Sequence, residues 1–196
     1  MNLLAHAFLS FHHPETLVGN MISDFVKGKK KYDYPESILN GINLHRAIDT
    51  FTDAHKATRL AATYLKPAAG AYAGAFVDVV YDHFLANDAT QFSSDSALET
   101  FAGETYAVLQ QNRNLLPDKF AGMFPYMQSQ NWLYNYKHIQ GVQNGFAGVA
   151  CRAKYIESSE ETFALFEKHY SSLQDCYRMF FPAVKEFAYA KWKEIL

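Results

Sequence analysis

The fold is decided by AYAGAFVDVVYDHFLA, the stretch from Ala71 to Ala86. Apolar side chains surround nearly the whole of the helix that this stretch predicts, so we expect the helix to be buried in a core. Its ionisable groups, the tyrosines apart, are Asp78, Asp82 and His83. Asp78 and Asp82 lie one helical turn apart and would repel each other as bare anions.

A buried carboxylate is costly unless it is paired, protonated or bound to a metal. Two arginines would be sufficient partners for Asp78 and Asp82, and this interpretation stays open. A divalent cation would satisfy both carboxylates and the neighbouring imidazole of His83 together. The sequence therefore favours a metal site on this helix.

A second helix with misplaced polar residues is predicted by GINLHRAIDTFTDAH, residues 41–55. His45, Asp49 and Asp53 follow one another at intervals of four and lie along one face of a helix. Ile38 and Ile42 extend the same line upstream, which indicates a face turned toward the core. The alternative is a polar stripe that faces water. The apolar face would then consist of Leu44, Ile48 and Phe51.

Two further apolar segments contain an isolated polar residue: His6 in MNLLAHAFLS and Asp24 in GNMISDFVKG. The alternative for His6 is a hydrogen-bonded core histidine, and for Asp24 a helix cap or a partner of Lys27. Taken together, four apolar segments each carry a misplaced histidine or aspartate. Helices that converge in this way build the metal centres of helical bundles.

The rest of the chain shows helical spacing throughout, with almost no strict apolar–polar alternation. The sequence predicts an all-α fold, a single-domain irregular helical bundle over residues 1–196. The expected helices span residues 2–12, 15–27, 35–54, 57–65, 68–87, 96–112, 118–138, 140–151 and 159–194. We expect Pro125 and Pro182 to kink or divide the long ones. Residues 27–35, KGKKKYDYP, are predicted to form a basic loop.

Bulk composition narrows the function classes. The 196 residues are 49% hydrophobic and carry a net charge of −2, which gives no case for nucleic acid. The apolar N-terminal stretch lacks a basic region and is too short to span a bilayer, so neither a signal peptide nor membrane association is expected. Cys151 and Cys176 match no metal or redox spacing and predict free thiols in a reducing cytoplasmic setting.

The candidate ligands also limit the choice of metal ions. Imidazole and carboxylate without thiolate suit manganese, magnesium or iron, with zinc as a further possibility. Such an ion lowers the pKa of a bound water and offsets charge on phosphate oxygens, which suits hydrolysis of a phosphate ester. The chain contains no GxxxxGK[ST], GxSxG or GxGxxG motif, so nucleotide-dependent phosphoryl transfer and serine hydrolysis lack their usual signals.

Four blocks in order, MNLLAHAFLS, GNMISDFVKG, GINLHRAIDTFTDAH and VDVVYDHFLA, resemble the acyl carrier protein phosphodiesterase family. They cover the chain from Met1 to about Ala86, and the second half is similar more loosely, around NWLYNY and QNGFAGVACR. That family is similar to the helical HD-type metal-dependent phosphohydrolases. The resemblance implies removal of the 4′-phosphopantetheine arm from holo acyl carrier protein by phosphodiester hydrolysis, with manganese favoured. Here the key pair runs Asp82–His83 rather than His–Asp, so ligand roles cannot be copied from standard HD enzymes.

We therefore predict a metal-centred catalytic site shared by several helices. Its core is expected to be Asp24, His45, Asp82 and His83, gathered around one cavity. Three more residues are expected to ligate the metal or orient the imidazoles: His6, Asp49 and Asp78. Arg46 follows His45 directly and is a candidate phosphate binder, with a surface ion pair as its alternative. Asp53 is expected to cap, to pair with an arginine or to face solvent.

The basic loop suggests how a carrier protein would dock. Acyl carrier proteins are acidic, so the lysines of the loop are candidates for electrostatic steering: Lys27, Lys29, Lys30 and Lys31. The alternative is a simply solvated lysine run.

Two other functions of the protein stay open. One is an HD-like hydrolase of a nucleotide or other small phosphate ester, and the other is a non-enzymatic helical binding protein. The sequence leaves the native metal and the oligomeric state undetermined.

Overall fold

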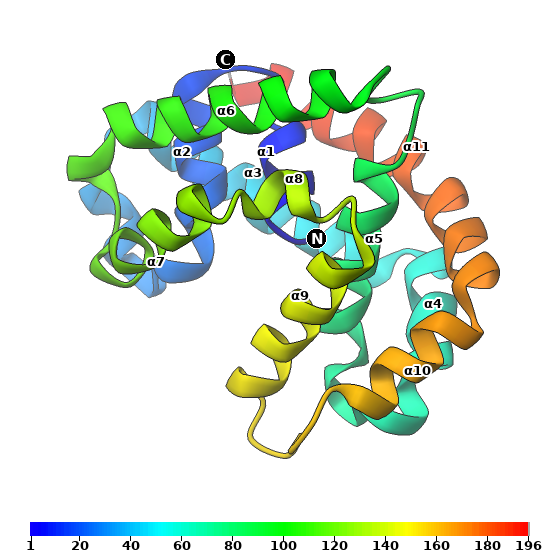
Figure 1. The fold of residues 1–196 in the computed structure, drawn as a ribbon. Helices are drawn as coiled ribbons and strands as arrows, with labels where there is room; N and C mark the ends of the chain where they lie inside the picture. Colours follow the sequence, from blue (N-terminus) through cyan, green and yellow to red (C-terminus); the bar gives the residue numbers. More distant parts are fainter. Residues whose placement is uncertain (196) are drawn as a thin grey trace.

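The computed structural model describes residues 1–195, and within them every regular element is a helix (Figure 1). The eleven α-helices of this range are α1 (Leu3–Phe8), α2 (Pro14–Ile22), α3 (Glu36–Ala54), α4 (Lys56–Ala69), α5 (Ala73–Ala86), α6 (Asp95–Gln111), α7 (Asp118–Ser129), α8 (Trp132–Asn135), α9 (Ile139–Arg152), α10 (Glu160–Lys168) and α11 (Tyr170–Ile195). Four short 3-10 helices join them: η1 (Ser23–Phe25), η2 (Gly28–Asp33), η3 (Gly70–Tyr72) and η4 (Arg113–Leu115). The prediction of an all-α bundle is confirmed.

Helix α5 lies in the middle of the bundle, as its apolar sequence predicts. Helices α1, α4, α9 and α11 all pack on it. Phe76 of α5 meets Phe146 of α9 edge to face, and Tyr81 stacks on Phe180 of α11. Because apolar side chains point outward in several directions, enclosure on all sides buries apolar surface and stabilises the helix.

Helices α2 and α3 pack unusually closely because two glycines face each other. A Cβ atom on Gly19 would clash with the carbonyl of Ile38, and one on Gly41 would clash with the carbonyl of Thr16. The absence of side chains lets the two backbones touch. This close approach brings Asn20 of α2 against His45 of α3.

Two long predicted helices are divided, but not at their prolines. The first breaks after α7 at Asn131, which adopts a left-handed φ of 46°. The second breaks at His169, between α10 and α11. Pro125 and Pro182 remain inside α7 and α11, since an internal proline removes one backbone hydrogen bond and the remaining bonds carry the helix on.

Several further boundaries differ from the sequence prediction. Helix α1 ends at Phe8 rather than at residue 12, and α4 continues through Pro67 to Ala69, where the sequence predicts a break. The α2 segment ends at Ile22, so Asp24 lies in the 3-10 helix η1 rather than in an α-helix. The basic stretch forms the 3-10 helix η2 instead of an irregular loop.

None of the helices in residues 1–195 is long and apolar enough to cross a lipid bilayer.

Candidate metal centre

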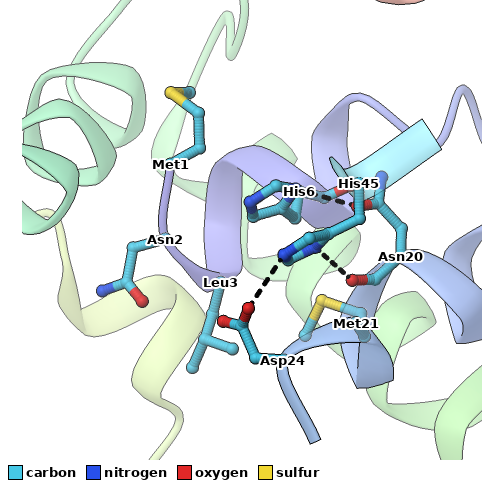
Figure 2. Close-up of a pocket in the computed structure, with 8 residues that line it drawn as sticks. All are labelled: Met1, Asn2, Leu3, His6, Asn20, Met21, Asp24 and His45. Carbon is cyan, nitrogen blue, oxygen red and sulfur yellow. Dashed lines mark hydrogen bonds and ion pairs between the residues drawn. The ribbon is translucent and has the colours of Figure 1, made fainter. Parts of the chain in front are cut away.

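Two buried histidines form the centre of the site (Figure 2). His6 comes from α1 and His45 from α3, and each side chain is almost completely enclosed. Their rings stack with centroids 3.8 Å apart and an interplanar angle of 14°. The packing of α1, α2 and α3 therefore presents two parallel imidazoles to one small volume.

Asn20 of α2 binds the Nδ1 atoms of both rings. His6 Nδ1 lies 2.8 Å from the side-chain oxygen of Asn20, and His45 Nδ1 lies 2.7 Å from the Asn20 main-chain oxygen. Since a carbonyl oxygen only accepts, each Nδ1 donates a hydrogen there. The Nε2 atoms are thereby left to face the other side.

The Nε2 atoms face carboxylates. Asp49 lies between the two rings, with Oδ1 at 3.1 Å from His6 Nε2 and Oδ2 at 3.1 Å from His45 Nε2. Asp24 Oδ1 is also 3.1 Å from His45 Nε2. One ligand atom each from His6, His45 and Asp49 lies within 4.8 Å of the others, and these three residues form a possible metal-binding site.

The donor set of this cluster fits a cation better than it fits protons. Each imidazole has oxygen acceptors at both ring nitrogens, but a neutral imidazole carries only one N–H. One acceptor on each ring would therefore face a lone pair unless the ring were protonated. Two stacked imidazolium ions would repel each other. A cation between the Nε2 atoms and the carboxylates removes the conflict on both rings.

The electrostatics of the cluster shift the pKa values of the two histidines in opposite directions. Burial opposes a charge on His45, but hydrogen bonds to Asp24 and Asp49 outweigh it and raise its pKa to about 9. Burial, with the neighbouring His45 charge, lowers the pKa of His6 to about 4. Burial also opposes ionisation of Asp49, yet the hydrogen bond from His45, with the neighbouring His6 and the Met1 amine, holds its pKa well below its usual range. Without a metal, one proton on His45 takes the place of the cation.

A cavity of about 20 Å³ lies against the cluster, large enough for one ion or one water molecule. Its lining consists of Met1, Asn2, Leu3, His6, Asn20, Met21, Asp24 and His45. The side chain of Asp24 is 73% exposed, so the site meets solvent at this residue.

Comparison with known proteins gives the family. A family model described as acyl carrier protein phosphodiesterase matches residues 1–184. Two proteins named acyl carrier protein phosphodiesterase, from Salmonella agona (strain SL483) and Salmonella newport (strain SL254), are each 32% identical to this chain over 185 residues. The matches cover 93% of this chain and 94% of each relative. The chain belongs to the acyl carrier protein phosphodiesterase family. No solved structure matches it.

Three of the four blocks that resemble the acyl carrier protein phosphodiesterase family supply the cluster. The first contributes His6, the second Asn20 and Asp24, and the third His45 and Asp49. The expectation that Asp24, His45, Asp82 and His83 gather around one cavity is corrected, because the fourth block has other contacts.

Asp82 is fully buried, and it binds the backbone of α1. Its Oδ2 accepts the Leu4 N–H at 2.7 Å and its Oδ1 accepts the Ala5 N–H at 3.1 Å. Burial raises its pKa to about 7, against the opposing effect of these two hydrogen bonds. Both oxygens are thus engaged in holding the first turn of the helix that carries His6.

His83 faces a different part of the core from Asp82. Its Nδ1 donates to the Tyr136 carbonyl at 2.7 Å, and its Nε2 accepts the Tyr170 hydroxyl at 2.9 Å. Successive residues of a helix point about 100° apart, and here the two side chains reach different neighbours. Asp78 accepts the Met1 amine at 2.9 Å, and that amine lies 3.4 Å from Asp49, which links Asp78 to the cluster indirectly.

Arg46 does not line the cavity. The four lysines predicted to bind a partner differ in their exposure and contacts. Arg46 Nη2 donates to the Val26 carbonyl at 2.9 Å, just beyond the 3-10 helix that carries Asp24. Lys31 donates to the side chain of Asn43 at 2.9 Å. The exposed lysines of this region are Lys27, Lys29 and Lys30.

Sequence reasoning missed Asn20. A signal was present, since Asn20 is a polar residue in the same apolar segment that drew attention to Asp24. Its role depends on the close packing of α2 and α3, which no local pattern reports.

Proposed function

We propose that this protein is a metal-dependent phosphodiesterase that hydrolyses the 4′-phosphopantetheine group from holo acyl carrier protein and leaves apo acyl carrier protein. Membership of the family supports the substrate and the reaction. The observation that carries the metal-dependent mechanism is the convergence of His6 Nε2, His45 Nε2 and the Asp49 carboxylate.

The proposed ligands are His6 Nε2, His45 Nε2 and an Asp49 oxygen, with Asp24 as a fourth donor. Two imidazoles and carboxylates without a thiolate suit Mn²⁺, Mg²⁺ or Fe²⁺, with Zn²⁺ as a further possibility. Among these the family resemblance favours Mn²⁺. A divalent cation held there would lower the pKa of a water molecule and offset charge on the phosphodiester oxygens. Asp82, His83 and Asp78 are left out of this ligand set, because their polar atoms are engaged elsewhere.

The protein side chains contribute position and charge. Asp49 holds both imidazoles in one orientation, and Asn20 holds them from the opposite side. Asp24 is exposed at the mouth of the site, and its hydrogen bond with His45 lowers its pKa, so it is ionised and available as the fourth metal donor. Arg46 remains a proposed phosphate ligand, since its guanidinium has donors beyond the one on Val26.

The cavity at the cluster is too small to enclose a nucleotide. A volume of about 20 Å³ admits an ion or a water, whereas small-molecule pockets span roughly 300–1,000 Å³. The phosphate would therefore be presented from solvent, as on an arm attached to a larger partner. The exposed lysines Lys27, Lys29 and Lys30 offer that acidic partner a positive surface. We also propose that this protein works in the cytosol, together with its carrier protein substrate. The two cysteines of residues 1–195 are free, which is in keeping with a reducing compartment.

The test is an intact-mass assay. Purified protein is incubated with holo acyl carrier protein, first after removal of metals with a chelator and then with added Mn²⁺. We expect the carrier protein to lose the mass of its prosthetic group only when Mn²⁺ is present. A parallel reaction with nucleoside monophosphates tests the small-ester alternative. Unchanged holo protein in the presence of an enzyme saturated with Mn²⁺ would contradict the proposal.

A further inference from the structure

Asn20 is a fully buried amide at the meeting point of α1, α2 and α3. Its side-chain nitrogen donates to the His6 carbonyl at 2.9 Å and to Ser10 Oγ at 3.1 Å. Its side-chain oxygen lies 2.8 Å from His6 Nδ1. Every polar atom of this side chain therefore has a partner.

The orientation of the amide follows from these partners. Ser10 Oγ donates its own hydrogen to the His6 carbonyl at 2.8 Å, so toward Asn20 it acts as an acceptor. Two acceptors at one end of the amide require the NH₂ group there. The oxygen must then point at His6, and His6 Nδ1 must carry a hydrogen.

The two imidazoles depend on Asn20 in different ways. His45 Nδ1 donates to the main-chain oxygen of Asn20, which no substitution at this position removes. His6 Nδ1 donates to the side-chain oxygen, which a substitution can remove. A change at residue 20 therefore affects one ring and leaves the other as an internal control.

We propose that Asn20 is a positioning residue that fixes the Nδ1–H tautomer of His6 and directs the bare Nε2 atom at the metal-binding site. The inference rests on the proposed function to the extent that the site must bind a cation. Groups that accept a hydrogen from a ligating histidine orient the ring, and their loss typically weakens metal binding by about 10–100-fold.

Two substitutions separate positioning from packing. Asn20→Asp keeps an oxygen for the His6 Nδ1–H and loses the NH₂ donors, whereas Asn20→Leu keeps the volume and loses all polar atoms. Ser10→Ala is the matched control, because it removes a partner of the NH₂ end and one hydrogen bond to the His6 main-chain carbonyl, but no contact of the His6 ring. Binding of Mn²⁺ is measured by electron paramagnetic resonance, and the melting temperature of each metal-free protein is recorded alongside.

We expect Asn20→Asp and Ser10→Ala to bind Mn²⁺ within about threefold of the wild type, and Asn20→Leu to bind at least tenfold more weakly. All three changes should lower the melting temperature, so a purely structural role would make affinity follow stability. In the Zn²⁺-loaded wild type, ¹⁵N spectra of the histidine side chains should show a hydrogen on Nδ1 of His6, a readout that does not depend on any variant folding.

Wild-type affinity in Asn20→Leu, or an unprotonated His6 Nδ1 in the Zn²⁺-loaded wild type, would overturn this inference and leave the proposed function standing. Failure of the wild type to bind either Mn²⁺ or Zn²⁺ would overturn both.

Discussion

At the scale of single residues, the proton on His45 and the metal compete for the same nitrogen. The carboxylates of Asp24 and Asp49 raise the pKa of His45 to about 9 despite its burial. An ion can bind Nε2 only after that proton leaves. Proton release therefore accompanies metal binding at every pH below about 9.

This competition predicts a pH dependence with a definite sign. Between pH 6.5 and 9 the affinity for Mn²⁺ should rise by about tenfold per pH unit, because one proton is displaced per ion, and above pH 9 it should level off. Titrations monitored by electron paramagnetic resonance at several pH values measure this slope. An affinity that stays constant from pH 6.5 to 9 would show that metal binding displaces no proton from His45 over this range.

The sequence predicts which residues are out of place, but not where each side chain points. His6, Asp24, His45 and Asp49 share the cluster because their helices cross at it. Asp82 gives the same sequence signal as Asp49, a carboxylate in an apolar helix, and yet it binds backbone amides. A buried carboxylate needs partners, and the sequence does not specify whether these are a metal, an arginine or the end of another helix.

At the scale of elements, Asp82 fastens α1 to α5. Helix α1 has only six residues, and the side chain of Asn2 at its N-cap makes no capping hydrogen bond. Asp82 supplies the missing acceptors from the neighbouring helix, for the N–H groups of Leu4 and Ala5. Without them these buried donors would be left unsatisfied.

Substitution at Asp82 should therefore weaken the metal-free fold in proportion to the acceptors removed. Asp82→Leu loses both oxygens and should destabilise the protein by about 1–3 kcal/mol for each orphaned N–H. Asp82→Asn keeps one oxygen and should cost about half as much. Urea unfolding in the presence of a chelator gives both values. Equal stability of Asp82→Leu and the wild type would mean that the contacts to α1 contribute nothing.

At the scale of the whole molecule, the exposed lysines of the η2 region are expected to steer the acidic partner. Lys27, Lys29 and Lys30 are exposed, whereas Lys31 is engaged with Asn43. Reversal of Lys29 and Lys30 to glutamate should raise KM for holo acyl carrier protein severalfold at low salt and leave kcat nearly unchanged.

The matched control reverses two exposed lysines elsewhere, Lys66 on α4 and Lys168 on α10. Helices α4 and α10 pack on each other, and in Figure 1 they lie at the lower right, away from α2 and α7. The control should leave KM unaltered. An equal rise in KM for both pairs would indicate a general effect of net charge instead of a docking surface.

The architecture of the bundle could be predicted from helical periodicity, including the burial of α5. The bounds of α3, α6 and α9 could also be predicted, to within one residue. The breaks inside the two longest predicted helices could not, because Asn131 and His169 end helices where the prolines do not. A left-handed residue such as Asn131 gives only a weak local signal.

The most direct test of the metal centre compares two carboxylates on one helix. Asp49 lies between the two histidines, while Asp53, one turn further along α3, is exposed. Binding of Mn²⁺ to the wild type, Asp49→Asn and Asp53→Asn is measured by electron paramagnetic resonance at pH 8. We predict one tightly bound Mn²⁺ per chain in the wild type and Asp53→Asn, and an affinity at least a hundredfold lower in Asp49→Asn. Equal binding by all three proteins would contradict a metal centre at His6, His45 and Asp49.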